Sequence, residues 1–236
     1  MRYQFEHPAS YAFLAAGSVL LSKGGSPNFS VKLGQEIFYR CSPYLPTSES
    51  LSLYDPCCGT AYWLTCLGVL NAGKIRHVFA SDIDPAFLEV AQKNLQILSP
   101  QGRQRRQEQL SSLFQEYQKP SHKMALSHLL HIGEEYLDQY QGPSIKVFER
   151  DVFSTAHRPD FQVDLLLTDV PYGDLVGWQG QGGINQLLTQ MIPHLHEQSV
   201  LAIVHDKYQK ISNDHFQRLE KFKVGKRVIE LLNLSR

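Results

Sequence analysis

LSLYDPCCGTAYWLT, from Leu51 to Thr65, consists of an apolar strand-like segment, an acid, a turn of small residues and an apolar helix-like segment. A strand, turn and helix in this order point backbone N–H groups at a bound adenosyl or nucleotide group. The turn must be small so that the backbone can approach the ligand, and its small residues are Cys57, Cys58, Gly59, Thr60 and Ala61. Asp55 precedes the turn, and only one of the three spaced glycines of a dinucleotide fingerprint is present, so the pattern disfavours NAD.

A second apolar segment, KIRHVFA from Lys74 to Ala80, predicts the next strand of a parallel sheet. It ends in SDIDP, which places Asp82 and Asp84 at the strand tip about twenty residues after the turn. A carboxylate at this position accepts hydrogen bonds from ribose hydroxyls. Together, the turn and these acids resemble the first two motifs of the Rossmann-like S-adenosylmethionine-dependent methyltransferases.

A third apolar segment, DLLLT from Asp164 to Thr168, is typical of a buried parallel strand and runs into TDVPYG. This tip resembles the Asp-Pro-Pro-Tyr motif of methyltransferases that modify nucleobase nitrogens, with Val170 in place of the first proline. The resemblance implies that Asp169 accepts a hydrogen bond from the target nitrogen. It also implies that Pro171 and Tyr172 hold the flipped base by stacking.

The segments YDPCCGTAYWLT, SDIDPAFLEVAQKNLQILSP and TDVPYG together resemble the avilamycin-resistance ribosomal RNA guanine methyltransferase family. The likeness runs from about Phe29 to the C-terminus and implies S-adenosylmethionine as cofactor. It implies a guanine of large-subunit (23S) ribosomal RNA as substrate, with N1 favoured over N2, and protection against orthosomycin antibiotics as a biological role. One departure is Ala61, where a glycine is expected, which would add a methyl group beside the cofactor.

The chain has 236 residues, 42% of them hydrophobic, enough for one large core. We expect a single methyltransferase domain over residues 1–236, and a monomer. No apolar run of membrane-spanning length and no secretory signal pattern is present, and the cysteines do not have disulfide or zinc spacing, so a cytoplasmic location is expected. His194, His196 and His205 do not form a ligand pattern, and no metal is expected.

Around these motifs the sequence predicts an α/β fold, with a mostly parallel sheet and helices on both faces. Residues 1–46 read as a cover segment whose last part, Val31 to Tyr44, has helical spacing. Pro85 occupies a favoured helix start, and residues of about 101–141 predict an inserted helical pair divided at Pro120. Phe222 to Leu234 predicts a final strand or a hairpin around Gly225.

Lysine and arginine together equal aspartate and glutamate, at 23 each, but the basic residues are concentrated in two segments. One lies between Gln101 and His131 and the other between His205 and Arg227. They predict either an RNA-binding surface or ordinary solvated faces. The residues proposed for RNA contact are Arg103, Arg105, Arg106 and Lys207, with Trp178 as a stacking residue in a glycine-rich loop.

Several alternatives remain open at this level. Asp151, after the third strand, resembles the acid that meets the adenine amino group, but an acid there can also cap a turn. The inserted helices can select the substrate or only complete the core, and Trp178 can dock on a neighbouring helix. A methyltransferase acting on a small molecule or a protein, and a catalytically silent RNA-binding module, are the competing functions.

Overall fold

The computed structural model describes residues 3–6, 10–15, 17–24, 29–154, 160–170 and 183–235. Its helices are η1 (Ala12–Leu14), α1 (Val31–Cys41), η2 (Ser42–Tyr44), α2 (Tyr62–Leu70), α3 (Pro85–Gln96), α4 (Pro100–Tyr117), α5 (Pro120–Ile132), the π-helical η3 (Gly133–Leu137), α6 (Ile184–Met191) and η4 (Ile192–His194). Its strands are β1 (Leu51–Asp55), β2 (Ile75–Asp82), β3 (Ser144–Glu149), β4 (Val163–Asp169), β5 (Leu195–Asp206), β6 (Phe216–Val224) and β7 (Arg227–Leu234).

The strands form one seven-stranded sheet in the order β3-β2-β1-β4-β5-β7-β6. The pairs from β3 to β5 are parallel, and β7 pairs antiparallel with both β5 and β6. The chain moves outward from β1 to β2 and β3, then returns to place β4 on the other side of β1. This reversal of strand order between β1 and β4 is the position where open α/β sheets bind their ligands.

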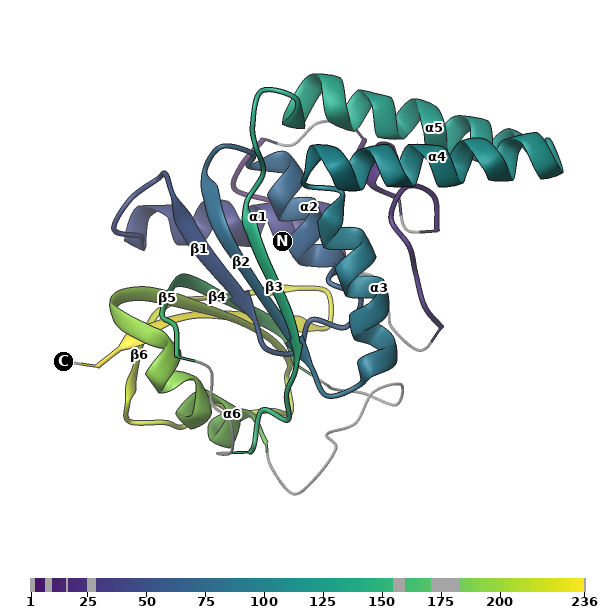
Figure 1. The fold of residues 1–236 in the computed structure, drawn as a ribbon. Coiled ribbons are helices and arrows are strands. Elements are labelled where there is room, and N and C mark those ends of the chain that lie inside the picture. Colours follow the sequence, from purple (N-terminus) through teal and green to yellow (C-terminus); the bar gives the residue numbers. More distant parts are fainter. Residues whose placement is uncertain are drawn as a thin grey trace.

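The sheet has a core on each face because successive strand residues point to opposite sides. Leu53 and Leu167 belong to the cluster shared with α1, α2 and α3, whereas Tyr54 and Leu166 belong to the cluster shared with α6. Figure 1 shows α1, α2 and α3 on one side of the sheet and α6 on the other. The predicted α/β fold is therefore confirmed.

Helix α1 packs closely on α2, and a glycine makes this possible. A Cβ atom built on Gly34 would lie 2.4 Å from Nε1 of Trp63, so no larger residue fits without moving the indole. Trp63 in turn stacks on Phe29, with ring centroids 4.3 Å apart. The side chain of Ser30 caps α1 by accepting from the N–H of Leu33 at 3.4 Å. The predicted helix over residues 31–44 is thus α1 continued by η2.

The predicted helical insertion is present as α4, α5 and η3, and it lies at the amino ends of the parallel strands. Figure 1 shows α4 and α5 side by side, extending beyond the sheet near the start of β3. The segment that connects η3 to β3 packs closely at this end of the sheet. A Cβ on Gly142 would lie 2.4 Å from the carbonyl oxygen of Leu98, and one on Gly73 would lie 2.4 Å from the Tyr140 ring. Gly73 and Gly142 both have positive φ, of 82° and 81°. The insertion therefore lies at the opposite end of the strands from Asp55 and Asp169.

The C-terminal segment forms a hairpin, which is one of the two forms the sequence predicts. Its strands β6 and β7 are joined at Gly225, whose φ of 61° is left-handed. Glu230 of β7 is buried and is contacted by Lys221 at 2.7 Å, by Arg218 at 3.3 Å and by His205 of β5 at 3.3 Å. Burial alone would raise the pKa of Glu230, but these partners outweigh it and lower that pKa to about 2.

Candidate active site

The candidate site lies at the carboxyl ends of β1, β2 and β4, on both sides of the strand-order reversal. Asp55 is the last residue of β1, Asp82 of β2 and Asp169 of β4. Strand β1 lies between β2 and β4 and is parallel to both, so the three strand ends are adjacent. In agreement, Asp82 and Asp169 both contribute to raising the pKa of Asp55. The structure thus brings together the three acids that the sequence assigns to three separate motifs.

The small-residue turn after β1 is held by backbone contacts with the end of β2. The N–H of Cys58 donates to the carbonyl of Ser81 at 2.9 Å, and the N–H of Gly59 donates to Oδ2 of Asp82 at 2.8 Å. Oδ1 of Asp82 accepts from the N–H of Asp84 at 3.1 Å. Asp82 therefore fixes the turn and the start of α3, in addition to any contact with a ligand.

Ala61 ends the turn in a left-handed conformation, with φ of 51° and ψ of 27°, and serves as the N-cap residue of α2. A left-handed backbone explains why a glycine is expected at this position. The sequence suggested that the extra methyl group would lie beside the cofactor. Ala61 is buried within the core cluster that includes α1 and α2, so its methyl group contributes to packing, and its place beside the cofactor stays a prediction. Thr60 is buried as well, and its carbonyl accepts from Nδ2 of Asn94 at 2.9 Å.

Burial makes the carboxylates of this site weak acids in the absence of a ligand. Asp55 is buried, and its N–H contact from Cys57 at 3.0 Å does not compensate for the lost water. Burial, with a contribution from Asp82 and Asp169, raises the pKa of Asp55 to about 8. Burial also raises the pKa of Asp82, against the lowering effect of the N–H groups of Asp84 and Gly59.

Asp84, which is partly buried, and Asp151, which is exposed, each close a local turn. Asp84 caps α3 by accepting from the N–H of Ala86 at 2.8 Å, with Pro85 at the first helical position. Oδ1 of Asp151 accepts from the N–H of Phe153 at 2.9 Å, which is the turn-capping alternative left open for this acid. Asp151 follows Arg150, whose N–H donates to the carbonyl of Asp82 at 3.0 Å, so it lies next to the end of β2.

Asp169 lies in a rigid part of the sheet. It is the last residue of β4 and pairs with Val204 of β5, and the N–H of the next residue, Val170, donates to the carbonyl of Val204 at 3.1 Å. Asp169 is partly buried. Pro171, Tyr172 and Trp178, for which the sequence predicts base-stacking roles, lie outside the described residues.

The three arginines proposed for RNA contact do not form one basic surface, and this prediction requires correction. Arg103 is buried and donates to Asp138 at 2.8 Å and to the carbonyl of Ile97 at 3.4 Å. Arg106 is buried too, and its guanidinium donates to the carbonyls of Val19 at 3.0 Å and Ser18 at 2.7 Å. These two residues attach α4 to the rest of the chain because they satisfy buried carbonyls.

Arg105 and Lys207 are exposed, and their predicted RNA contacts remain predictions. The guanidinium of Arg105 contacts Gln96 at 3.5 Å, and Arg105 lies on α4 at the amino end of the sheet. Lys207 follows β5 directly and lies at the carboxyl end, on the same side as Asp169. Of the two, only Lys207 is near the acids.

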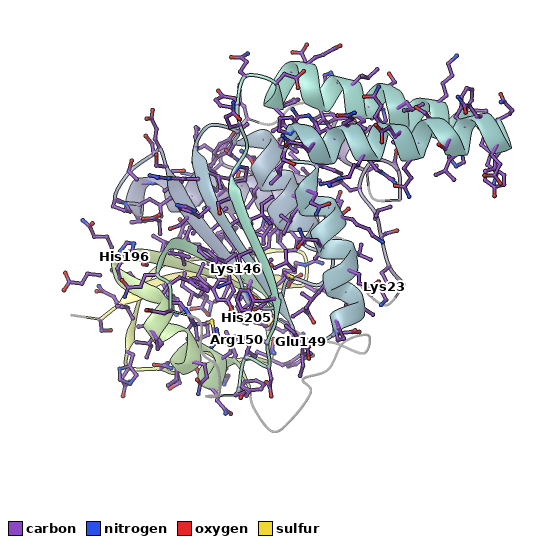
Figure 2. The ribbon with its side chains drawn as sticks, in the orientation of Figure 1. Lys23, Lys146, Glu149, Arg150, His196 and His205 are labelled. Carbon is purple, nitrogen blue, oxygen red and sulfur yellow. The ribbon has the colours of Figure 1, made fainter. Side chains whose placement is uncertain are left out.

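A buried polar chain behind the turn was not foreseen from the sequence. The hydroxyl of Ser81 donates to the carbonyl of Pro56 at 3.3 Å and lies 2.8 Å from the hydroxyl of Tyr54. Nη1 of Arg150 donates to the Tyr54 hydroxyl at 3.1 Å and lies 2.7 Å from Nε2 of His194. This series of polar contacts connects the turn to η4 on the face of the sheet that α6 covers. Figure 2 shows Arg150 next to Glu149 at the end of β3.

Arg150 is a buried cation, 7% exposed, and within the described residues its Nε and second Nη have no hydrogen-bond partner. Its charge lowers the pKa of Tyr54, although burial is the larger effect and raises that pKa to about 12. A single arginine after a strand carries no sequence signal for such a role. The sequence signal would have been Tyr54, on the α6 side of β1, together with His194, which ends η4 just before β5.

The site suits a cationic ligand. Several buried or partly buried carboxyl groups surround the turn, and burial, with a smaller contribution from neighbouring acids, raises the pKa values of Asp55 and Asp82. A positive charge beside them would favour their ionised forms. S-adenosylmethionine carries a sulfonium and an ammonium group, so it would supply that charge. Among the residues that the structure describes, no cluster of three metal-ligating side chains occurs, and no helix is long and apolar enough to cross a membrane.

Comparison with known proteins gives one family over nearly the whole chain. Residues 1–227 match the model of the family described as rRNA methyltransferase AviRa. A 23S rRNA (guanine(2535)-N(1))-methyltransferase from Streptomyces viridochromogenes is 36% identical over 229 residues, covering 94% of this chain and 91% of that protein.

Solved structures agree with this match. Two structures of the rRNA methyltransferase aviRa from Streptomyces viridochromogenes superpose with a TM-score of 0.85 at 33% identity, covering 99% of this chain and 96% of theirs. TrmN from Thermus thermophilus has a TM-score of 0.54 at 13% identity, covering 90% of this chain and 51% of that chain. At that identity, the TrmN match supports the fold alone.

Proposed function

Because the chain belongs to the AviRa family of rRNA methyltransferases, we propose that it transfers a methyl group from S-adenosylmethionine to N1 of a guanine in 23S rRNA. The observation that carries the proposal is the convergence of Asp55, Asp82 and Asp169 at the strand-order reversal, next to the small-residue turn after β1. N1 is proposed over N2 because the Streptomyces relative is named for N1. Protection of the ribosome against orthosomycin antibiotics is a further expectation.

The turn and the ends of β2 and β3 would hold the cofactor. The carboxylate of Asp82 accepts the backbone N–H groups of Gly59 and Asp84 and has lone pairs left over, so it can also accept ribose hydroxyls. Asp151, beside the end of β2, would meet the adenine amino group. Asp55 would face the cationic part of the ligand, together with Cys57, Gly59, Thr60 and Ala61 of the turn and Asp84 beyond β2. When bound, S-adenosylmethionine supplies the electrophilic methyl group.

Asp169 would act on the guanine. N1 of guanine carries a proton and must lose it when it forms a bond to carbon. A carboxylate within hydrogen-bond reach of N1–H increases the electron density on nitrogen and accepts the proton. The pairing of β4 with β5 fixes the position of Asp169. A fixed position matters because methyl transfer requires the nitrogen, carbon and sulfur atoms to be aligned. Pro171, Tyr172 and Trp178 are proposed to hold the base by stacking.

The decisive experiment is the Asp169→Asn variant. It keeps the shape of the side chain but removes the proton acceptor, so methylation of transcribed 23S rRNA should fall about 10²–10⁴-fold. The affinity for S-adenosylmethionine, measured by calorimetry, should change little. Primer extension identifies the position, because a methyl group on N1 blocks the pairing edge and stops the polymerase, whereas one methyl group on N2 does not.

A matched control is available on the same strand. Asp164 lies near the amino end of β4, where it accepts from Ser52 at 2.7 Å and contacts His196 at 3.2 Å. Asp164→Asn should alter stability without a large change in methylation. Near-normal turnover by Asp169→Asn would overturn the proton-transfer mechanism. If the wild-type protein binds S-adenosylmethionine but methylates neither naked 23S rRNA nor assembled subunits, a small-molecule or protein substrate becomes the better explanation.

A further inference from the structure

Tyr208, in the loop after β5, presents an unusually exposed aromatic ring. The side chain is 78% exposed, and Nζ of Lys207 lies 4.7 Å from the ring centroid. Lysine covers a ring by a cation–π contact from one side, which leaves the other face open. An open aromatic face beside a positive charge suits a nucleotide, because the base stacks on the ring while the phosphate meets the ammonium group.

The backbone at Tyr208 is held in place rather than loosely attached. Oδ1 of Asp206 accepts from the N–H of Tyr208 at 2.7 Å and from the N–H of Gln209 at 3.0 Å. In return, the N–H of Asp206 donates to Oε1 of Gln209 at 3.3 Å. Asp206 itself is the last residue of β5 and pairs with Arg227 of β7. The turn is therefore fixed to the central part of the sheet, so a base that stacks on Tyr208 need not order the loop first.

The end of β5 and the loop after it contact described residues on both sides of positions 171–182, where the proposed base-binding motif lies. At one end, Val170 donates to Val204 at 3.1 Å. At the other end, Nδ2 of Asn185 donates to the carbonyl of Lys210 at 3.1 Å, and Oδ1 of Asn185 accepts from the N–H of Ser212 at 2.8 Å. The stretch from Val204 to Ser212 therefore contacts Val170, which precedes positions 171–182, and Asn185, which follows them.

Strand geometry limits the distance between Tyr208 and Asp169. Asp169 pairs with Val204, and Tyr208 is four residues further along the chain. With a strand spacing of about 4.8 Å and about 3.4 Å per residue, the two Cα atoms are at most about 18 Å apart. Nucleotides that flank a base held at Asp169 lie within this range.

We propose that Tyr208 and Lys207 form a subsite for the nucleotide next to the target guanine. Flipping a base out of its stack leaves its neighbour without a stacking partner, and the ring of Tyr208 replaces that partner. Lys207 neutralises the adjacent phosphate. The subsite rests on the proposed function, because it assumes that a guanine in RNA is bound at Asp169. It assigns to this loop the positioning of the substrate, not a step in methyl transfer.

The test compares Tyr208→Ala, Tyr208→Phe and the control Tyr44→Ala on an RNA hairpin containing the guanine mapped by primer extension. Tyr44 is also exposed, at 42%, but it lies in η2 before β1, at the opposite end of the strands. Loss of one stacking contact should raise the KM for RNA about tenfold to a hundredfold in Tyr208→Ala, with kcat changed little. Tyr208→Phe should retain the wild-type KM, and Tyr44→Ala should be unaffected.

A second readout reports stacking directly. 2-Aminopurine placed on the 5′ or the 3′ side of the guanine should lose fluorescence on binding to the wild-type protein at one of the two positions, and Tyr208→Ala should abolish that loss. Lys207→Gln should lower the slope of log affinity against log salt by about one.

The outcomes separate the subsite from the reaction. Methylation by the wild-type protein with less than a twofold KM change in Tyr208→Ala overturns the subsite alone. Equal losses in Tyr208→Phe and Tyr208→Ala also overturn it, since stacking does not need the hydroxyl group. If the wild-type protein modifies no guanine, both the proposed function and the subsite are overturned.

Discussion

The protonation state of Asp55 should make cofactor binding depend on pH. The pKa of Asp55 is raised to about 8 in the ligand-free protein, mainly by burial, so at pH 7 most molecules carry a neutral carboxylic acid at the end of β1. A cationic ligand favours the carboxylate. Binding of S-adenosylmethionine should therefore release a proton from Asp55 below pH 8, and affinity should rise with pH.

The size of the effect follows from the pKa. If Asp55 is ionised in the complex, the affinity falls about tenfold for each pH unit below 8 and levels off above it, so the change between pH 6 and pH 8 is about 50-fold. The α-amino group of the cofactor titrates in a similar range and binds a proton where Asp55 releases one. The Asp55→Asn variant removes only the protein's contribution, so the difference between wild type and variant isolates it.

Calorimetry in two buffers with different ionisation enthalpies counts the protons directly. At pH 6 to 7 the wild type should release nearly one proton more than Asp55→Asn. Without ligand, Asp55 of the folded protein keeps its proton up to about pH 8, whereas in the unfolded chain it loses that proton near pH 3.8. The free energy of unfolding should therefore fall as the pH rises toward 8. Asp55→Asn should flatten that decline. Identical proton counts and parallel stability profiles in the two proteins would refute the reasoning.

Two further predictions concern residues whose contacts the structure defines. Arg106→Ala should lower the free energy of unfolding in urea by about 2–4 kcal/mol, because buried carbonyls lose their donor, while Arg105→Ala should stay within about 0.5 kcal/mol; equal effects would contradict the assignment. Asp82→Ala should weaken S-adenosylmethionine binding by roughly 1.5–3 kcal/mol and also lower the melting temperature, because Gly59 loses its acceptor. Lower stability with unchanged affinity would make Asp82 a purely structural residue.

The sequence allowed the fold to be predicted because local and long-range signals agree. Asp55 and Asp82 end strands that contain several buried residues, and parallel strands place their carboxyl ends at one edge of the sheet. Pro85, Pro100 and Pro120 each begin a helix, which is their favoured position. Such signals depend on a few adjacent residues, so they can be recognised without knowledge of tertiary contacts.

The prediction for Arg103 and Arg106 was wrong for the opposite reason. Their spacing with Arg105 suggests a basic surface, but their partners are 35 residues away at Asp138 and 88 away at Ser18. Nothing in a helix sequence shows which arginine meets a buried carbonyl. The position of the insertion at the amino ends of the strands was equally hidden, because it depends on the close packing at Gly73 and Gly142.

Several features that are unfavourable for folding lie together at one edge of the sheet. Asp55 is buried without enough positive charge nearby, Arg150 is buried with unpaired nitrogens among the described residues, and Ala61 adopts a backbone that favours glycine. Each is unfavourable for the isolated protein, and together they surround the same turn. Locally inconsistent positions are expected where a ligand completes the structure. Ligand binding should therefore stabilise the turn more than the rest of the fold, and amide hydrogen exchange at Gly59 and Asp84 should slow most on adding S-adenosylmethionine.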